Sequence, residues 1–159
     1  MEATPENPNG PKLIRLLMWT ITLSSMSALM FNIVLPQVSD EFQLSYAQVS
    51  WLTSGYTIIY AFGTVTYGKL ADRFPLKNLL MFGLLLFAFG SLVGLFSDSF
   101  WTALLGRCLQ SAGASAVPAS AMIIPARYFP PERRGLALGT TAVGVALGSA
   151  LAPVVSAAI

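Results

Sequence analysis

Apolar residues gather in five long stretches along the chain, separated by short polar or charged segments. A helix needs roughly 20 apolar residues to cross the hydrocarbon core of a membrane. The pattern therefore predicts five membrane-spanning helices, at about residues 13–36, 48–70, 78–96, 101–126 and 136–159. Because the connections are short, we expect consecutive helices to be antiparallel neighbours.

The composition supports a membrane location. Hydrophobic residues make up 55% of the 159 residues and charged residues only 10%, whereas soluble domains carry about 25% charged residues. A domain of this size could not hide so much apolar surface from water. We therefore predict an all-α membrane protein, embedded in the lipid bilayer of a plasma or inner cell membrane.

The chain begins with a segment of different character. Residues 1–12 are rich in proline, asparagine and glutamate, which predicts a disordered tail. Lys12 and Arg15, followed by an apolar run, would also fit a signal peptide. That run continues to Pro36, however, which is long for the hydrophobic region of a signal peptide. The first apolar stretch is therefore interpreted as a membrane helix.

The basic residues predict the orientation. Eight of the nine lysines and arginines lie around the start of the first helix, around the connection between the second and third, or between the fourth and fifth. These three regions are all on one side of the membrane. The loops on the other side contain Asp40, Glu41 and Asp98 but no basic residue. Because basic loops face the cytoplasm, we expect a multi-pass protein whose N-terminal tail is cytoplasmic.

Residue types that carry catalysis and metal binding are scarce. The chain has no histidine, the commonest general base and metal ligand. Its one cysteine, Cys108, excludes an internal disulfide and a cysteine-based metal cluster. No nucleophile–base pair is visible, and no basic run marks nucleic-acid binding. We expect neither an enzyme nor a metal or cofactor site, and no nucleic-acid partner.

Arg107 is the ninth basic residue, and it lies well inside the fourth predicted helix. It lies about six residues from the outer end, roughly 9 Å deep at 1.5 Å per residue, where inserting an arginine costs on the order of 2.5–3.5 kcal/mol. Gln110 follows on the same face. Arg107 could snorkel to the interface, but the interpretation we favour is a polar cavity inside the bundle. Asn32 and Tyr56 are candidates for the lining of that cavity, or simply packing residues.

The last predicted helix carries a stripe of small residues. Gly144, Gly148, Ala152 and Ser156 recur every four residues, a spacing that lets another helix approach closely. Pro153 removes one backbone hydrogen bond and should bend the helix. The stripe fits tight packing alone and a flexible helix at a moving interface equally well.

The segment between the second and third helices contains Gly68, Asp72, Arg73 and Lys77. Asp72 stands where one helix ends and the next begins, so it could accept hydrogen bonds from free helix N–H groups and pair with Arg73 or Lys77. Gly68 would permit close backbone contact. An ordinary basic loop that flanks the membrane is the alternative.

Three of these segments resemble signatures of the major facilitator superfamily. Residues 68–77 resemble the loop signature G-x-L-A-D-R-x-G-R-K, with Pro75 and Leu76 in place of the usual glycine and arginine. Residues 107–114 resemble the fourth-helix signature R-x-x-Q-G-x-G-A, with Ser111 in place of a glycine. Residues 148–157 resemble the fifth-helix antiporter signature G-x-x-x-G-P-x-x-G-G, of which Gly148 and Pro153 are kept. The resemblance covers nearly all of the chain after the tail.

The resemblance implies a fold and a function. The chain would supply about five helices of the N-terminal half of a transporter, most similar to the drug:proton antiporters of the 14-helix tetracycline and multidrug type. Its substrate would be a small amphipathic or cationic molecule, exchanged for protons by alternating access. Arg107 would take part in coupling or cavity electrostatics. The segment with Asp72, Arg73 and Lys77 would form a cytoplasmic gate, and the small-residue stripe a sliding interface.

Two observations qualify this implied function. The five predicted helices contain no embedded aspartate or glutamate, and proton coupling needs a titratable group, so the coupling carboxylate would lie elsewhere. Transporters of this superfamily have two halves, so we expect this chain to be a fragment, inactive without the missing C-terminal helices. The alternatives are a superfamily transporter for another solute, and a small membrane protein that acts as a structural or regulatory partner.

Overall fold

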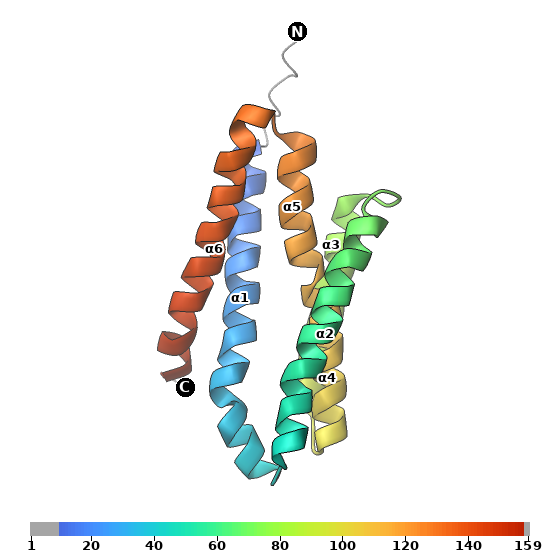
Figure 1. Ribbon diagram of the computed structural model, residues 1–159, viewed down its shortest axis with the longest axis vertical. Coiled ribbons are helices and arrows are strands. Elements are labelled where there is room, and N and C mark those ends of the chain that lie inside the picture. Colours follow the sequence, from blue (N-terminus) through green and yellow to red (C-terminus); the bar gives the residue numbers. More distant parts are fainter. Residues whose placement is uncertain (1–9, 158–159) are drawn as a thin grey trace. The chain divides into compact units, whose positions relative to one another are not determined.

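A computed structural model describes residues 10–157, and every regular element among them is a helix. The helices are α1 (Gly10–Glu41), α2 (Tyr46–Leu70), α3 (Leu76–Leu95), α4 (Phe100–Ala114), α5 (Ala116–Tyr128) and α6 (Pro131–Ala157) (Figure 1). The predicted all-α fold class is confirmed. Most of the predicted tail, residues 1–9, lies outside the described residues, whereas residues 10–12 already belong to α1.

Three of the described helices are long and apolar enough to cross a membrane: Ile14–Glu41, Leu76–Leu95 and Pro131–Ser156. Helix α2 has 25 residues, which include several tyrosines, threonines and glycines, and it is not among these three. Helices α4 and α5 have only 15 and 13 residues. Large apolar side chains such as Leu85, Phe89 and Val154 are exposed. Apolar surface of this extent is typical of helices that face lipid, so the protein is embedded in a membrane.

Capping residues fix the starts of α2 and α4. The Ser45 side chain accepts a hydrogen bond from the N–H of Gln48, and Gln48 Oε1 accepts one from the N–H of Ser45 at 2.9 Å. Ser99 and Thr102 make the same reciprocal pair at the start of α4. Such a capping box satisfies N–H groups that have no carbonyl partner within the helix.

The helix predicted at residues 101–126 is interrupted. Helix α4 ends at Ala114 and α5 begins at Ala116, with Ser115 between them. Pro118 explains the interruption, because a proline has no N–H to donate to the carbonyl of Ala114, four residues earlier. The prediction of one continuous helix is therefore wrong at this point.

The first helix is longer than predicted. The sequence placed its end at Pro36, whereas α1 continues through Pro36 to Glu41.

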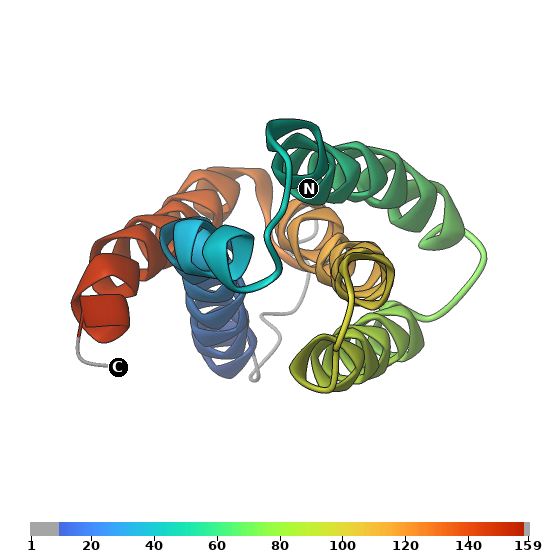
Figure 2. The ribbon, with the colours of Figure 1, turned by 90° about the horizontal axis from the view of Figure 1, so that it is seen from below.

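The chain divides into two compact units. The central unit comprises residues 31–119, and in it α4 packs against both α2 and α3. Viewed from below, α4 lies between these two helices (Figure 2). The terminal unit comprises residues 1–30 and 120–159, of which the structure describes 10–30 and 120–157. It contains the first part of α1 and all of α6.

Glycines let α3 and α4 approach closely in the central unit. A Cβ atom on Gly90 would lie 2.5 Å from the backbone nitrogen of Gln110. One on Gly113 would meet the backbone oxygen of Gly83. These are backbone atoms, which cannot rotate away as a side chain would, so the contact requires glycine at both positions. The close contact holds in place the helix that carries Arg107.

The small-residue stripe of α6 packs against α1 in the terminal unit. A Cβ atom on Gly144 would lie 2.8 Å from the carbonyl oxygen of Met18, and one on Gly148 would lie 2.5 Å from that of Thr22. Ala152, the next residue of the stripe, is fully buried. The stripe therefore serves close packing of two helices, as its spacing predicted. Its role as a sliding interface stays a prediction.

Pro153 lies inside α6, and the helix continues through it to Ala157. Its ring is exposed, whereas the preceding Ala152 faces the buried side. Although Pro153 cannot donate a backbone hydrogen bond, α6 does not end at this residue.

Candidate functional site

Arg107 lies in the interior of the central unit, where it is only 7% exposed. Its Nη1 donates a hydrogen bond to Oε1 of Gln110 at 2.9 Å, and Nε2 of Gln110 donates to Oγ of Ser91 at 2.9 Å. The Ser91 hydroxyl donates in turn to the carbonyl oxygen of Phe87 in the same helix, also at 2.9 Å. These bonds join α4 to α3. A side chain that is buried and bonded in this way is engaged inside the unit, which favours the cavity interpretation over snorkelling.

Two aromatic rings contact the guanidinium. Its central carbon lies 3.6 Å from the ring centroid of Phe31 in α1 and 4.3 Å from that of Tyr56 in α2, which are cation–π distances. The Tyr56 ring stacks on that of Tyr60, with centroids 5.9 Å apart. Ser111 fixes the backbone here, because its hydroxyl donates to the Tyr56 carbonyl oxygen at 2.5 Å. We define the arginine cluster as the five residues Phe31, Tyr56, Ser91, Arg107 and Gln110.

The arginine cluster contains no acidic side chain. The aspartates and glutamates among residues 10–157 all lie at helix ends or in turns and are exposed: Asp40, Glu41, Asp72, Asp98 and Glu132. The Nε atom of Arg107 is buried and has no hydrogen-bond partner within the described part of the chain. Burying a charge is costly unless it is paired. The cluster therefore holds a positive charge and an N–H donor that residues 10–157 leave unmatched.

The structure brings together three of the four residues predicted to line a cavity. Arg107, Gln110 and Tyr56 meet in the cluster, whereas Asn32 is exposed on α1 and its neighbour Phe31 makes the contact instead. Sequence reasoning missed Phe31 and Ser91. Ser91 had a signal, since it carries the one hydroxyl group in the apolar helix α3. Phe31 had none, because one phenylalanine among many apolar residues does not show which ring meets a cation.

The predicted gate residues lie at the surface of the central unit. Asp72, Arg73 and Lys77 are exposed, the first two in the turn after α2 and the third at the start of α3. The N-cap of α3 is Pro75, three residues after Asp72. A Cβ atom on Gly68 would meet nothing within 4 Å. The close backbone contact expected at Gly68 is therefore not made within the described residues.

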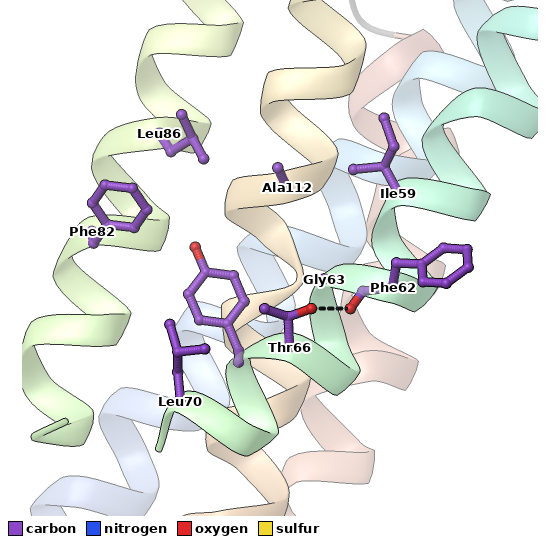
Figure 3. Close-up of a pocket in the computed structure, with 9 residues that line it drawn as sticks. Ile59, Phe62, Gly63, Thr66, Leu70, Phe82, Leu86 and Ala112 are labelled. Carbon is purple, nitrogen blue, oxygen red and sulfur yellow. Dashed lines mark hydrogen bonds between the residues drawn. The ribbon is translucent and has the colours of Figure 1, made fainter. Parts of the chain in front are cut away.

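An apolar groove lies between α2, α3 and α4 (Figure 3). Its volume is about 370 Å³, and it is lined by Ile59, Phe62, Gly63, Thr66, Tyr67, Leu70, Phe82, Leu86 and Ala112. The hydroxyl of Thr66 is already used, since it donates to the carbonyl oxygen of Phe62 at 2.8 Å (Figure 3). No lining residue is charged, so the groove suits an apolar chain. It is distinct from the arginine cluster and shares no residue with it.

Comparison with known proteins finds relatives among transporters. The sequence model of the Major Facilitator Superfamily matches residues 17–159. The riboflavin transporter RibZ of Clostridioides difficile is 27% identical over 139 residues, which cover 87% of this chain and 30% of that protein. The MFS-type transporter YwoD of Bacillus subtilis is 32% identical over 131 residues, which cover 82% of this chain and 29% of that protein. The chain thus spans about 30% of the length of these relatives.

The fold has a close counterpart among solved structures. The crystal structure of a bacterial homologue of the human lysosomal transporter Spinster, in an inward-facing and unoccupied conformation, has a TM-score of 0.86 to this chain. The match covers 96% of this chain and 32% of the other, at 24% sequence identity, so it shows a shared fold. The family match over residues 17–159 establishes that the chain belongs to the Major Facilitator Superfamily.

Proposed function

We propose that the chain forms the N-terminal part of a transporter that moves a small amphipathic molecule across a cell membrane by alternating access. The observation that carries this proposal is the buried Arg107 in a membrane-embedded member of this family. Ionisable residues inside membrane proteins are expensive to insert, and they mark substrate or ion pathways. The basic loops favour a cytoplasmic N-terminus.

Proton-driven drug export is the first candidate for the transport reaction. The order of the three signatures supports it, as does the retention of Gly148 and Pro153 in α6. Proton coupling needs a group that titrates within the membrane. Since the acidic side chains of residues 10–157 lie at helix ends and in turns, the coupling carboxylate in this proposal belongs to a part of the transporter outside that range.

Transport of a metabolite is the second candidate. One specific observation favours it, namely the 27% identity to a riboflavin transporter over 87% of this chain. Riboflavin is a planar aromatic molecule, and the arginine cluster offers two aromatic rings and a guanidinium. Such groups stack on flat ligands as well as on each other.

Inside-out membrane vesicles that contain the native gene product would separate the two candidates. In energised vesicles, a drug exporter should accumulate several unrelated cationic dyes, and the accumulation should collapse when the proton gradient is removed. A metabolite transporter should instead move riboflavin and ignore the dyes. Vesicles without the protein give the baseline. Failure of every dye to accumulate would count against drug export.

The turn that contains Gly68, Asp72, Arg73 and Lys77 is proposed as a cytoplasmic gate. Its charged side chains are exposed and lie next to the ends of α2 and α3, where they can reach a neighbouring part of a transporter. Asp72→Asn in the native gene product should slow turnover several-fold and leave the order of substrate preference unchanged, because a gate acts on the conformational step. A changed substrate range at normal turnover, in the same vesicle assay, would contradict the gate role.

A further inference from the structure

The apolar groove of the central unit runs along one face of α2. Its lining residues on this helix begin at Ile59 and end at Leu70, with the i, i+3, i+4, i+7 spacing of a single helix face. At 1.5 Å per residue, these two residues are roughly 16 Å apart along the helix. One leaflet is half of a hydrocarbon core that is about 30 Å thick. The groove is therefore about as long as one lipid leaflet is thick.

The walls of the groove are apolar, and its middle is formed by small residues. Gly63 of α2 and Ala112 of α4 have little or no side chain to fill the space, and Ala112 lies between the two walls (Figure 3). Phe62 on the α2 side and Phe82 on the α3 side are 73% and 59% exposed. Apolar rings that are exposed in this way favour contact with lipid. The groove therefore suits one flexible hydrocarbon chain.

Positive charge gathers where the groove ends. Lys69 adjoins Leu70, the last lining residue of α2, and the N–H of Arg73 donates to the carbonyl oxygen of Leu70 at 3.0 Å. Lys77 lies in the first turn of α3. We define residues 69–77 as the basic turn. With three basic residues and the acidic Asp72, all of them exposed, its net charge is +2, so it attracts an anionic group at the membrane surface.

An apolar groove one leaflet long that ends at a basic turn matches the two parts of an anionic phospholipid. Basic segments beside membrane helices attract anionic head groups of the cytoplasmic leaflet, and the basic loops favour that side for this turn. We propose that the groove binds one acyl chain of an anionic phospholipid, whose phosphate lies at Lys69, Arg73 and Lys77. This lipid site shares no residue with the arginine cluster, and the inference does not depend on the transport reaction.

Lipid titration of the detergent-purified native gene product tests the head group. Bound lipid would be counted by native mass spectrometry, with phosphatidylglycerol and with phosphatidylcholine of the same acyl chains. Phosphatidylglycerol should bind at least about tenfold more tightly. The double change Lys69→Gln and Lys77→Gln should remove this preference, whereas Arg134→Gln changes an exposed arginine outside the basic turn and should keep it. Equal affinity of the wild-type protein for the two lipids would overturn the proposal.

Thr66→Phe tests the groove, because Thr66 lines it and is exposed. The added ring would occupy the space of the acyl chain and should weaken phosphatidylglycerol binding at least about fivefold. Thr57→Phe is the matched control. Thr57 is also exposed on α2 and also donates to the carbonyl oxygen four residues earlier, but it does not line the groove. Its variant should bind within about twofold of wild type, and equal affinities of the two variants would overturn the groove as the acyl-chain site.

A helix from another part of the transporter is the competing occupant of the groove. In that case Thr66→Phe would lower the Tm of the lipid-free protein and leave its affinity for phosphatidylglycerol unchanged, which would overturn the proposal. If Thr66→Phe does not fold, the double lysine variant still decides, since it alters no residue of the groove. Because these are binding and stability measurements, their outcome is independent of whether the protein transports any of the substrates tested.

Discussion

Replacing Arg107 with alanine in the native gene product is expected to lower the initial rate of transport about 10- to 100-fold, as the loss of a hydrogen bond to a charged group would. The change removes the one buried charge of the central unit, its bond to Gln110 and its contacts with Phe31 and Tyr56. Insertion should be unaffected or easier, because an arginine inside a membrane helix is costly to insert. The measurement is initial flux in vesicles, normalised to the amount of inserted protein.

Two further variants show whether the loss of transport comes from the place of Arg107 in the arginine cluster or from the loss of any positive charge. Arg134→Ala removes an exposed arginine at the start of α6 and should leave flux within about twofold, since exposed charges contribute little. Arg107→Lys keeps the charge but has no planar N–H donors, so it should restore less than half of the wild-type flux. If Arg107→Ala transports normally, the arginine serves neither substrate nor coupling, and the site assignment is wrong.

The second large effect is expected at the contact between α3 and α4. Gly113→Ala places a methyl group against the backbone oxygen of Gly83 and the backbone nitrogen of Phe87. Neither helix can relieve the clash by a side-chain rotation, so the helices must separate. Overpacking of this kind costs about 1–3 kcal/mol. We expect a clear fall in Tm of the detergent-purified protein and a lower yield in the membrane.

Gly94→Ala is the matched control for this prediction. Gly94 is also a glycine of α3, but a Cβ atom there would meet nothing within 4 Å. Alanine is favoured over glycine in a helix by roughly 0.8–1.0 kcal/mol, so Gly94→Ala should be neutral or slightly stabilising. Equal Tm values for Gly113→Ala and Gly94→Ala would show that α3 and α4 are not packed as closely as the structure indicates.

The sequence predicted the fold class and the positions of most helices because long apolar stretches leave few alternatives to membrane helices. It also identified the packing stripe of α6, since small residues at a spacing of four share one helix face. It did not predict the interruption at Ser115. Pro118 was visible in the sequence, but a proline inside a membrane helix is often tolerated, and its local effect depends on the neighbouring helices.

Only part of the arginine cluster could be predicted. Arg107 and Gln110 were found because they are polar, three residues apart and inside a predicted membrane helix. Their partners come from other helices, as with Ser91 in α3 and Phe31 in α1. Contacts between residues that are distant in sequence depend on how the helices pack, which the pattern of a single sequence does not encode. Asn32 is exposed on α1, one residue away from Phe31, which makes the contact, and its role in lining a cavity stays a prediction.

The central claim is that this chain is part of a membrane transporter with Arg107 at its working site. Its most direct test is net flux in vesicles that contain the native gene product, compared with vesicles that lack it, for cationic dyes and for riboflavin. The account predicts flux of at least one of these probes and its loss in Arg107→Ala. A stable, correctly inserted protein that moves none of them in either direction would contradict it.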